Sequence, residues 1–556
     1  MRIAFLTFEY PDVRPGGVGS YVLKCAAALA AAGHEPHVFT LTVPESSRAS
    51  LRPGIHLHEV ADVAERVAGG SLPAMMGAVA LGSTPAAYKL AVAALLCDEL
   101  RREHAKATFD IVEAAECDAL GLPLIVQPIE KLPVVVQIHL GLALNSIANG
   151  VPSTERDELA EALELASTVG ADAVCAATQS VVDAYRNIEG FSREVSIVPH
   201  AVDAAGITPT PPPESGGILF VGRLQKRKGC DVLAAAADIF LRRNPTASVR
   251  FAGSDTPTGP GGSSMLAEMM SRVDAELHSR FVYLGELSQP ELRREIAACR
   301  FQVVPSTMEN FANTACDAMA HGRLVIYGGN TGLDEVVGDA GLRVWPLTAE
   351  NLADAMEKAW NDAALTRSRG QLGHQRVVEK FNPARVTAAR IDFYRRVIAD
   401  HGESKRQWDA LRPEQVRAVM AALVDSTAAP LGLAGKTESP GQRLVSRLID
   451  LARRLNRPPV VWLFGAGRYT QRLLGEKYVW ESARFAIAGI VDEHPRFKQT
   501  PNLLGFQVRN PEQLCIAVER GECVDAIILS TDTLQDVFRA RAECFRDLGV
   551  EVIAIS

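Results

Sequence analysis

The chain has 556 residues, a length that suggests three or four domains rather than one. Hydrophobic residues make up 47% and charged residues 22% of it, which predicts ordinary buried cores and excludes a wholly disordered chain. The formal net charge of −8 argues against a nucleic-acid scaffold, which typically carries a basic domain.

The ten cysteines show neither Cys-x-x-Cys spacing nor a Cys/His cluster with zinc-ligand spacing, so we expect free thiols and a cytoplasmic location. The N-terminus passes from Met1 directly into a strand pattern, unlike a signal peptide. Residues Gly69 to Tyr88 carry no charge, but four glycines and two prolines favour a buried helix and loop over a membrane span. Peripheral contact with a membrane stays open.

The first part of the chain alternates strands and helices. Ile3 to Thr7 reads as a buried strand, Pro11 to Gly19 as a loop, Tyr21 to Ala32 as a helix and His37 to Leu41 as the next strand. This order predicts a parallel sheet. Further strands are expected at Phe109–Glu113, Val134–His139, Ala173–Ala176 and Val195–Pro199, with helices at Ala86–Lys106 and Ser153–Ser167.

A Pro/Gly/Ser-rich stretch from Pro209 to Gly217 marks a domain boundary, and a second α/β series follows. Its expected strands are Ile218–Val221, Val249–Gly253, Phe281–Leu284, Phe301–Pro305 and Leu324–Tyr327, with helices at Asp231–Arg243, Leu347–Ala359 and Asn382–Ala399. We therefore predict a first domain at 1–205, to which a closing helix at about 382–400 returns, and a second domain at 206–381. Two such domains in tandem share a cleft at the C-terminal ends of their strands.

A third series begins after a helical and Pro/Gly-rich linker at 401–457. Residues 458–556 contain strand, turn and helix in a Rossmann-like order, with Gly465 and Gly467 in the turn and Asp492 at the end of the next strand. Thr470 replaces the third glycine of a dinucleotide fingerprint. The predicted roles are either a nucleotide site at Gly465, Gly467 and Asp492 or a domain that only packs or oligomerises.

Two motifs carry the chemistry of a sugar-nucleotide site. Arg223 and Lys228 flank a basic turn that follows a strand, where they can neutralise a departing diphosphate without a metal. A helix is expected at Asn313–His321, with Glu309 in the loop before it and Asp317 on it. There a carboxylate can accept hydrogen bonds from a ribose diol, and unpaired backbone N–H groups can bind hydroxyls. The alternatives are an exposed basic turn at Lys226, Arg227 and Lys228, and a capped helix with a solvated acid.

Three further features of the sequence are candidate parts of the site, on weaker patterns. Gly16 and Gly17 belong to a glycine loop that lets a ligand approach the backbone, or only forms a tight turn. His139 ends an apolar strand and is either a site residue or structural. Glu113 and Glu116 end another strand and read as acceptor contacts or, with more weight, as a cap and a surface acid.

In this order, the glycine loop, strand-end histidine, basic loop and Glu-x7-acid helix resemble the GT-B glycosyltransferases of family 4 over about residues 1–400. The resemblance implies an α/β GT-B fold, in which two Rossmann-like domains face a cleft, and here a third small one follows. It makes 1–205 the acceptor-side domain and 206–381 the nucleotide-sugar-binding domain. It implies a retaining enzyme that needs no metal or cofactor and moves a hexose-type sugar from a nucleoside-diphosphate sugar to a saccharide, lipid-linked or small-molecule acceptor.

By the same resemblance, Arg223 and Lys228 hold the diphosphate, Glu309 contacts the donor sugar, and Asp317 holds the ribose. The amides around Asn310, Phe311 and Ala312 hold the sugar, Gly16 and Gly17 lie near phosphate and acceptor, and His139 lies beside the donor sugar. Asp317 and Ala312 depart from the usual Glu and Gly. A non-catalytic sugar-nucleotide-binding or scaffold protein, and a nicotinamide-dependent oxidoreductase acting through 458–556, are therefore the competing hypotheses.

Overall fold

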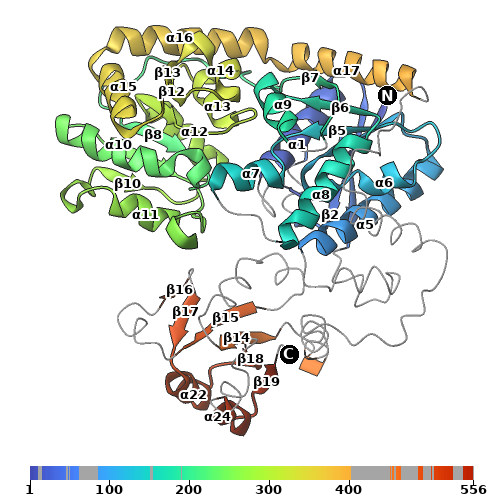
Figure 1. Ribbon diagram of the computed structural model, residues 1–556, viewed down its shortest axis with the longest axis vertical. Helices are drawn as coiled ribbons and strands as arrows, with labels where there is room; N and C mark the ends of the chain where they lie inside the picture. The colour runs from blue at the N-terminus through green and yellow to red at the C-terminus, as the bar shows by residue number, and fades with distance from the viewer. Residues whose placement is uncertain are drawn as a thin grey trace. The chain divides into compact units, whose positions relative to one another are not determined.

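The computed structural model describes residues 1–10, 16–45, 48, 51–61, 85–150, 155–188, 191–401, 451, 454–455, 459–464, 486–492, 502–503, 506–529 and 542–554. It contains three sheets that follow one another along the chain (Figure 1). The first two belong to one compact unit and the third to another. We call the parts built on the first and second sheets the first and second lobes.

The first lobe is built on a seven-stranded parallel sheet in the order β3-β2-β1-β4-β5-β6-β7. Its central strands β4 and β5 are buried along their whole length, which explains why their sequences are apolar except for Glu113 and Gln137. The strands are β1 (Arg2–Leu6), β2 (Glu35–Leu41), β3 (His56–Val60), β4 (Ile111–Ala115), β5 (Val134–Ile138), β6 (Ala173–Ala176) and β7 (Val195–Ile197). The helices are α1 (Gly17–Ala31), α5 (Pro85–Lys106), η1 (Cys117–Ala119), α6 (Leu122–Val126), α7 (Leu142–Asn149), α8 (Glu155–Gly170) and α9 (Gln179–Arg186).

The second lobe is built on a six-stranded parallel sheet in the order β10-β9-β8-β11-β12-β13. Its strands are β8 (Ile218–Val221), β9 (Val249–Ala252), β10 (Phe281–Tyr283), β11 (Phe301–Val304), β12 (Leu324–Gly328) and β13 (Leu342–Val344). Its helices are η2 (Lys226–Lys228), α10 (Cys230–Arg243), η3 (Pro260–Gly262), α11 (Met265–Ser271), η4 (Ala275–Leu277), α12 (Gln289–Ala298), α13 (Asn313–Ala320), α14 (Gly332–Val336), η5 (Gly338–Ala340), α15 (Ala349–Asn361) and α16 (Ala363–Lys380).

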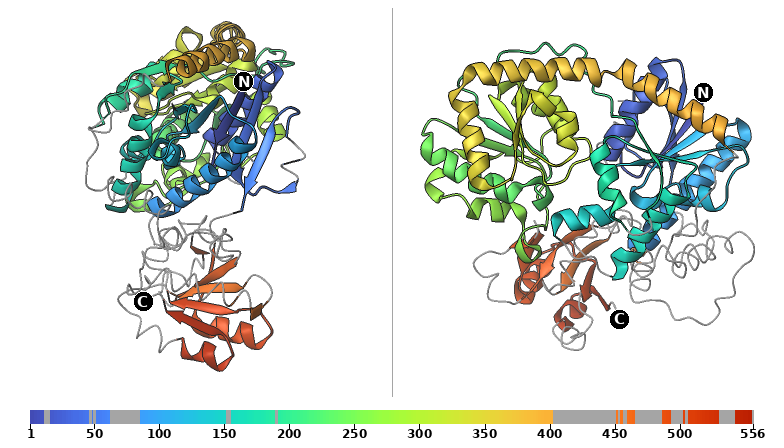
Figure 2. Two further views of the ribbon diagram at one scale, coloured as in Figure 1. Left: turned by 90° about the vertical axis from the view of Figure 1, so that its right-hand side faces the viewer. Right: turned by 45° about the horizontal axis from the view of Figure 1, so that its top comes forward.

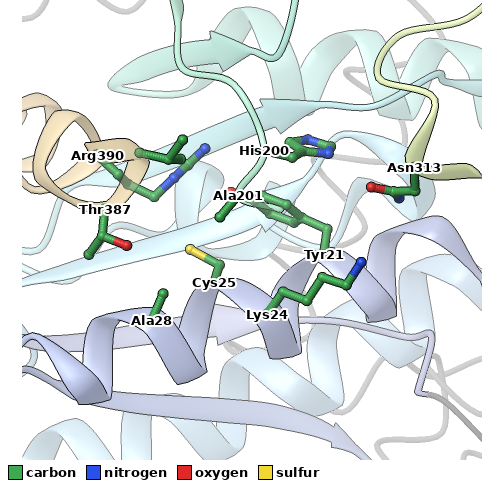
Figure 3. A pocket seen from close by; sticks show the side chains of 10 residues that line it. Tyr21, Lys24, Cys25, Ala28, His200, Ala201, Asn313, Thr387 and Arg390 are labelled. Carbon is green, nitrogen blue, oxygen red and sulfur yellow. The ribbon is translucent and has the colours of Figure 1, made fainter. Parts of the chain in front are cut away.

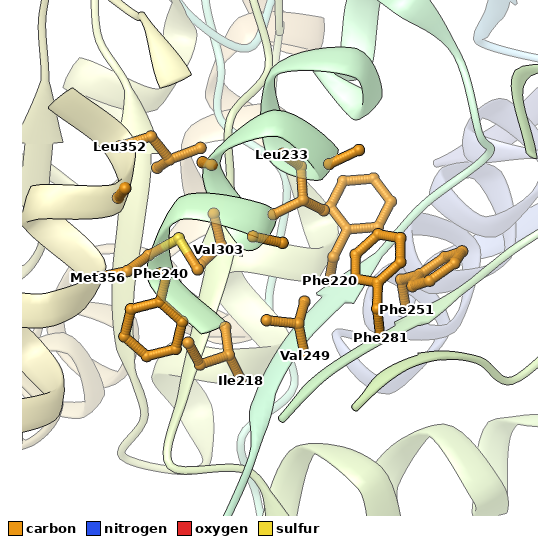
Figure 4. Close-up of a cluster of buried hydrophobic side chains, with 14 of the residues drawn as sticks. Ile218, Phe220, Leu233, Phe240, Val249, Phe251, Phe281, Val303, Leu352 and Met356 are labelled. Carbon is orange, nitrogen blue, oxygen red and sulfur yellow. The ribbon is translucent and has the colours of Figure 1, made fainter. Parts of the chain in front are cut away.

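The core of the second lobe lies between α10 and one face of this sheet (Figure 4). Phe220, Phe240 and Phe251 are almost fully buried there, as is Leu233 of α10. Such aromatic side chains remove large apolar areas from water and keep the loops at the strand ends on a rigid base.

Helix α17 (Pro383–Asp400) follows α16 and lies on the first lobe, whereas α16 lies on the second (Figure 2). Its buried Arg390 pairs with Glu113 of β4, with Nη1 and Oε2 2.7 Å apart. Tyr21 of α1 and Tyr394 of α17 donate hydrogen bonds to the same carboxylate, each at 2.7 Å. This buried network fixes α17 to the first lobe.

The third sheet has the order β16-β17-β15-β14-β18-β19, parallel except for the β16–β17 pair. Its elements are β14 (Val460–Phe464), β15 (Ala486–Val491), β16 (Asn502–Leu503), β17 (Phe506–Arg509), α22 (Pro511–Glu519), β18 (Ala526–Leu529), α24 (Glu543–Asp547) and β19 (Glu551–Ala554). The predicted α/β fold with a third Rossmann-like sheet is confirmed.

Some predicted boundaries were wrong. The loop expected up to Gly19 ends earlier, because Gly17 already begins α1. Helix α16 and strand β3 were not predicted, since their apolar positions are sparse and mixed with histidine or charged residues. Most of the linker at 401–457 and of the stretch from Gly69 to Tyr88 lies outside the described residues. Within the part that is described, no helix has both the length and the apolar character needed to cross a membrane.

Candidate active site

The candidate site residues follow the central strands of the two lobes. Strand order reverses between β1 and β4 in the first sheet and between β8 and β11 in the second. Open α/β sheets bind ligands at such reversals, at the C-terminal ends of the strands. Arg223 and Lys228 lie in the 222–229 loop after β8, and Glu309 lies in the 305–312 loop after β11.

Gly229 lets these two loops of the second lobe touch. It has a left-handed conformation, with φ of 69°, and a Cβ atom there would lie 1.9 Å from the carbonyl oxygen of Pro305. Any other residue would force the loops apart. The close approach places two sequence motifs, 81 positions apart, within hydrogen-bonding distance.

Glu309 is the centre of a buried charge cluster. Its carboxylate forms an ion pair with Lys228, accepts a hydrogen bond from the Ser306 hydroxyl at 2.9 Å, and lies 3.7 Å from the Arg227 guanidinium. Burial by itself would raise the pKa of Glu309, but Lys228 and Arg227 outweigh it and the pKa falls below its ordinary value. The cluster therefore keeps a fixed anion beside a cation at the end of β11.

Arg227 corrects the interpretation of the basic turn as a solvated stretch. Its side chain is only 6% exposed, and it donates to the carbonyl oxygen of Met308 at 2.9 Å. Its own carbonyl accepts hydrogen bonds from the backbone and hydroxyl of Thr307. Arg227 thus fastens the 305–312 loop to the 222–229 loop, whereas Arg223 and Lys226 are exposed.

The segment Asn310 to Ala312 is buried and joins the lobes. The Asn310 side chain donates to the carbonyl oxygen of Ile138 in β5 at 2.9 Å and contacts the Thr178 hydroxyl at 3.3 Å. Within the described part of the chain, the backbone N–H groups of Asn310, Phe311 and Ala312 have no acceptor. Ala312 is also the N-cap of α13, so these N–H groups add to the partial positive charge of a helix start.

A second pair of lobe contacts involves Glu335, which no sequence motif singled out. Its carboxylate oxygens in α14 accept hydrogen bonds from the backbone N–H groups of Gln179 and Ser180, at 2.8 and 2.7 Å. These N–H groups belong to the first turn of α9 in the first lobe. The contact holds the two lobes together beside Asn310.

His139 lies at the end of β5, next to this segment. Burial, together with the charge of Arg390, lowers the pKa of His139 to about 3, so the ring is neutral at pH 7. Its Nε2 atom is buried and has no hydrogen-bond partner among the described residues. A neutral ring nitrogen in this place can accept from, or donate to, a sugar hydroxyl.

The backbone that follows the glycine loop binds Glu9, which was not predicted as a site residue. Glu9 accepts hydrogen bonds from the backbone N–H groups of Val18 and Gly19, at 2.8 and 3.1 Å, and so caps α1. A Cβ atom on Gly16 would lie 2.0 Å from the Glu9 carboxyl group, whereas the space beside Gly17 is open. The sequence signal that could have pointed to Glu9 is an acidic residue shortly after the first strand and before a glycine loop.

Glu9 also connects the two lobes electrostatically. Burial and the neighbouring Asp118 raise the pKa of Glu9, whereas the N–H groups of Gly19 and Val18 and the charge of Arg223 oppose the rise. Arg223 in the 222–229 loop thus acts electrostatically on the acid that binds the start of α1.

Asp317 is not part of the Glu309 cluster. It lies on α13 as predicted, burial raises its pKa, and the cations that act on it are Lys24, His321 and Arg293. Lys24 projects from α1 towards a narrow pocket that Asn313 lines from the second lobe (Figure 3). The two acids of the Glu-x7-acid motif thus have different cationic neighbours.

The interpretation of Glu113 and Glu116 as a cap with a surface acid is wrong, because both are buried, 2% and 0% exposed. Glu113 belongs to the Arg390 network. Glu116 accepts hydrogen bonds from the backbone N–H of His139 at 2.8 Å and from the Tyr185 hydroxyl at 3.2 Å. Burial and the nearby Glu164 raise the pKa of Glu116 to about 8.

This raised pKa predicts a pH-dependent stability. Glu116 is protonated in the folded protein up to about pH 8 but ionises near pH 4.5 when unfolded, so it costs stability increasingly from pH 4.5 to 8, by roughly 5 kcal/mol at most. Glu116→Gln keeps the accepting oxygen and cannot ionise. We expect the variant to lose less stability than the wild type between pH 5 and pH 8.5, as measured by urea midpoints. Parallel curves for the two proteins would refute the assignment.

A cavity of about 470 Å³ opens beside the 222–229 loop of the second lobe. Asn149 and Gly150 line it from the first lobe, and Lys226, Asp231, Thr258 and Arg272 from the second. Its volume is that of a small-molecule site. The backbone N–H of Arg227 donates to the Asn149 side chain at 3.0 Å, which ties the wall of this cavity to the Glu309 cluster.

The nucleotide site predicted for the third sheet is described only in part. Gly465 and Gly467 lie outside the described residues. Asp492 follows β15, and its backbone N–H donates to the carbonyl oxygen of Arg509 at 2.9 Å. Strand order reverses between β14 and β18 in this sheet.

Comparison with known protein families finds matches to the first two lobes. Residues 15–205 match the model described as Glycosyltransferase Family 4, and residues 215–362 match the model described as Glycosyl transferases group 1. The two matches together span the first and second lobes. They support the resemblance to glycosyltransferases that the motifs indicated for this part of the chain.

Individual relatives share about a quarter of their residues with this chain. A glycogen synthase of Mycobacterium tuberculosis (strain H37Rv) is 26% identical over 421 residues, which cover 73% of this chain and 97% of that protein. A D-inositol 3-phosphate glycosyltransferase of Frankia alni is 28% identical over 369 residues, 62% and 85% of the respective chains.

Solved structures share the fold at lower identity. Sucrose-phosphate synthase from Thermosynechococcus elongatus superposes with a TM-score of 0.56 at 23% identity and covers 72% of this chain and 99% of its own. Anabaena Alr3699/HepE in complex with UDP-glucose gives 0.52 at 16%, covering 71% and 100%. Both are glycosyltransferase structures of the GT-B fold, which this chain shares over its first two lobes.

Proposed function

We propose that the chain is a retaining glycosyltransferase that moves a hexose-type sugar from a nucleoside-diphosphate sugar to a saccharide, lipid-linked or small-molecule acceptor. One observation carries the proposal. The Lys228–Glu309 pair lies at the strand reversal of the second lobe, next to three buried N–H groups that have no acceptor among the described residues. Through Asn310 it is linked to the end of β5, which carries His139.

Each group has a place in the binding of such a donor. Arg223 and Lys228 neutralise the diphosphate, and the N–H groups of Asn310, Phe311 and Ala312 bind hydroxyls of the sugar. Glu309 accepts from a further sugar hydroxyl while its charge is held by Lys228. Asp317 takes the ribose, and Lys24 is the cation that acts on it most strongly.

The relatives support a nucleotide-sugar donor. HepE was solved with UDP-glucose, and the glycogen synthase and inositol-phosphate enzymes are named for sugar transfer. We extend this to the present chain as a donor-binding second lobe, residues 206–381, and an acceptor-binding first lobe, residues 1–205, closed by the helix at 382–400. Residues 458–556 form an accessory domain, in which Gly465, Gly467 and Asp492 are the candidate nucleotide contacts.

The reaction needs no nucleophile from the protein. The acceptor hydroxyl attacks the anomeric carbon on the face from which the diphosphate leaves, the bond from that carbon to the diphosphate oxygen breaks, and this oxygen takes the hydroxyl proton. Arg223 and Lys228 stabilise the charge that develops on the diphosphate. Neutral His139 and Glu9 at the start of α1 position the reacting groups, and the lobe contacts of Asn310 and Glu335 exclude water.

Release of nucleoside diphosphate from a panel of nucleotide sugars tests the proposal directly. We expect release with at least one donor, faster with an acceptor, and unchanged after the divalent metal is removed with a chelator. Binding detected by thermal shift without release would instead indicate a sugar-nucleotide-binding scaffold. An absorbance change with a nicotinamide cofactor would indicate the oxidoreductase, and loss of release on chelation would overturn metal independence.

A further inference from the structure

Two cysteines of the third sheet's unit lie against each other. Cys515 on α22 and Cys544 on α24 are 29 positions apart, and their Sγ atoms are 2.8 Å apart, with Cys515 as the donor. A disulfide bond has an S–S length of about 2.05 Å, so small side-chain rotations bring the two sulfurs into bonding distance.

The backbone on both sides of this contact is fixed by the core. Leu514 precedes Cys515, Phe545 follows Cys544, and both neighbours are fully buried in the apolar cluster of this sheet. Ala542, just before α24, is buried in the same cluster. The two helices therefore hold the cysteines against each other from a buried base.

We propose that Cys515 and Cys544 are an oxidative modification site, forming a reversible intramolecular disulfide when the protein meets a peroxide. The site belongs to the third sheet and is independent of the glycosyl transfer proposed for the first two lobes. The sequence led us to expect ten free thiols, and this proposal changes that expectation for one pair, which is arranged for bond formation.

The exposure of the two cysteines decides which of them reacts first with the oxidant. Cys544 is exposed and accepts the hydrogen bond, whereas burial and the contact with Cys544 raise the pKa of Cys515 to about 12. Cys515 therefore keeps its proton, and the sulfur of Cys544 meets the oxidant.

In the first step the Cys544 sulfur attacks a peroxide oxygen, the O–O bond breaks, and a sulfenic acid and one water form. In the second step the Cys515 sulfur attacks the Cys544 sulfur, the S–O bond breaks, and a second water leaves. Two thiols lose two protons and two electrons, and one hydrogen peroxide is reduced to two waters. The new bond closes a loop of the chain and restricts the unfolded state.

The test treats the reduced full-length protein with a small excess of hydrogen peroxide and then titrates thiols after denaturation. We expect the ten thiols to fall by two, and dithiothreitol to restore them. Peptide mapping without reduction should recover one linked pair of peptides, which contain Cys515 and Cys544. Unchanged thiols, a link that involves another cysteine, or a covalent dimer on a non-reducing gel would each overturn the proposal.

Single variants separate the two roles. Cys515→Ser should stop the reaction at a sulfenic acid on Cys544, which dimedone traps, and Cys544→Ser should abolish the reaction. Cys523→Ser is the matched control, because Cys523 is the other exposed cysteine among the ten and the pair stays intact. If Cys523→Ser prevents the link, or dimedone labels Cys515 in place of Cys544, the assigned pair or order is wrong.

Discussion

Replacing Arg223 by alanine is expected to lower turnover by about 10²-fold, the loss typical of a missing donor that stabilises transition-state charge. Arg223 is exposed after β8 and, among the described residues, forms no ion pair, so its guanidinium is available to a diphosphate. Lys228, by contrast, is already paired with Glu309. The measurement is the rate of nucleoside-diphosphate release with the donor that the panel identifies.

Lys226→Ala is the matched control, because Lys226 lies in the same loop, is equally cationic and is exposed. Its removal should leave turnover within a few-fold of the wild type if the loss on Arg223→Ala is specific. Arg223→Lys should recover only part of the rate, since an ammonium group cannot bind a phosphate bidentately. Equal losses for Arg223→Ala and Lys226→Ala would mean that the loop acts only through its overall charge.

Replacing Arg390 by methionine is expected to destabilise the unit that contains the first two sheets by about 3–5 kcal/mol. The Arg390 and Glu113 side chains are 1% and 2% exposed, so the variant leaves a carboxylate buried without its cation. Tyr21 and Tyr394 still donate to it, but neither supplies charge. A lower urea midpoint at pH 7.5 would report the loss.

Arg395→Met gives the comparison on the same helix. Arg395 pairs with Asp392 on the surface, at 66% and 64% exposure, and such pairs contribute little to stability. Adding Glu113→Gln to Arg390→Met should restore part of the lost stability, because it removes the unpaired charge. If Arg390→Met destabilises no more than Arg395→Met, the buried network does not hold α17 on the first lobe.

The sequence predicted the sheets well because buried parallel strands are short apolar runs, as in Ile218–Val221 and Val134–Ile138. It predicted α13 and placed Glu309 before it and Asp317 on it. It missed α16, whose pattern is largely polar, and began α1 too late because glycines read as loop. The local pattern of apolar residues reveals strands and strongly amphipathic helices, but it does not reveal a helix whose apolar face is weak.

The site was predicted unevenly for a related reason. Arg223, Lys228 and Glu309 stood out by residue type, but nothing in the spacing showed that Lys228 and Glu309 pair. Arg227 was grouped with exposed cations, although it is buried and organises both loops. Glu9 had no motif of its own, and its role follows only from its hydrogen bonds to the start of α1.

By itself, the sequence of this protein determined the kind of fold and the chemical groups available, since periodicity and residue type are local properties. Only the tertiary structure decided which groups meet. The reversal of strand order brings the loops after β8 and β11 together, and Gly229 removes the steric barrier between them. Burial sets the charge of His139 and Glu116, whereas Lys228 and Arg227 set the charge of Glu309. Contacts between distant segments and their removal from water depend on the whole fold, which no short stretch of sequence contains.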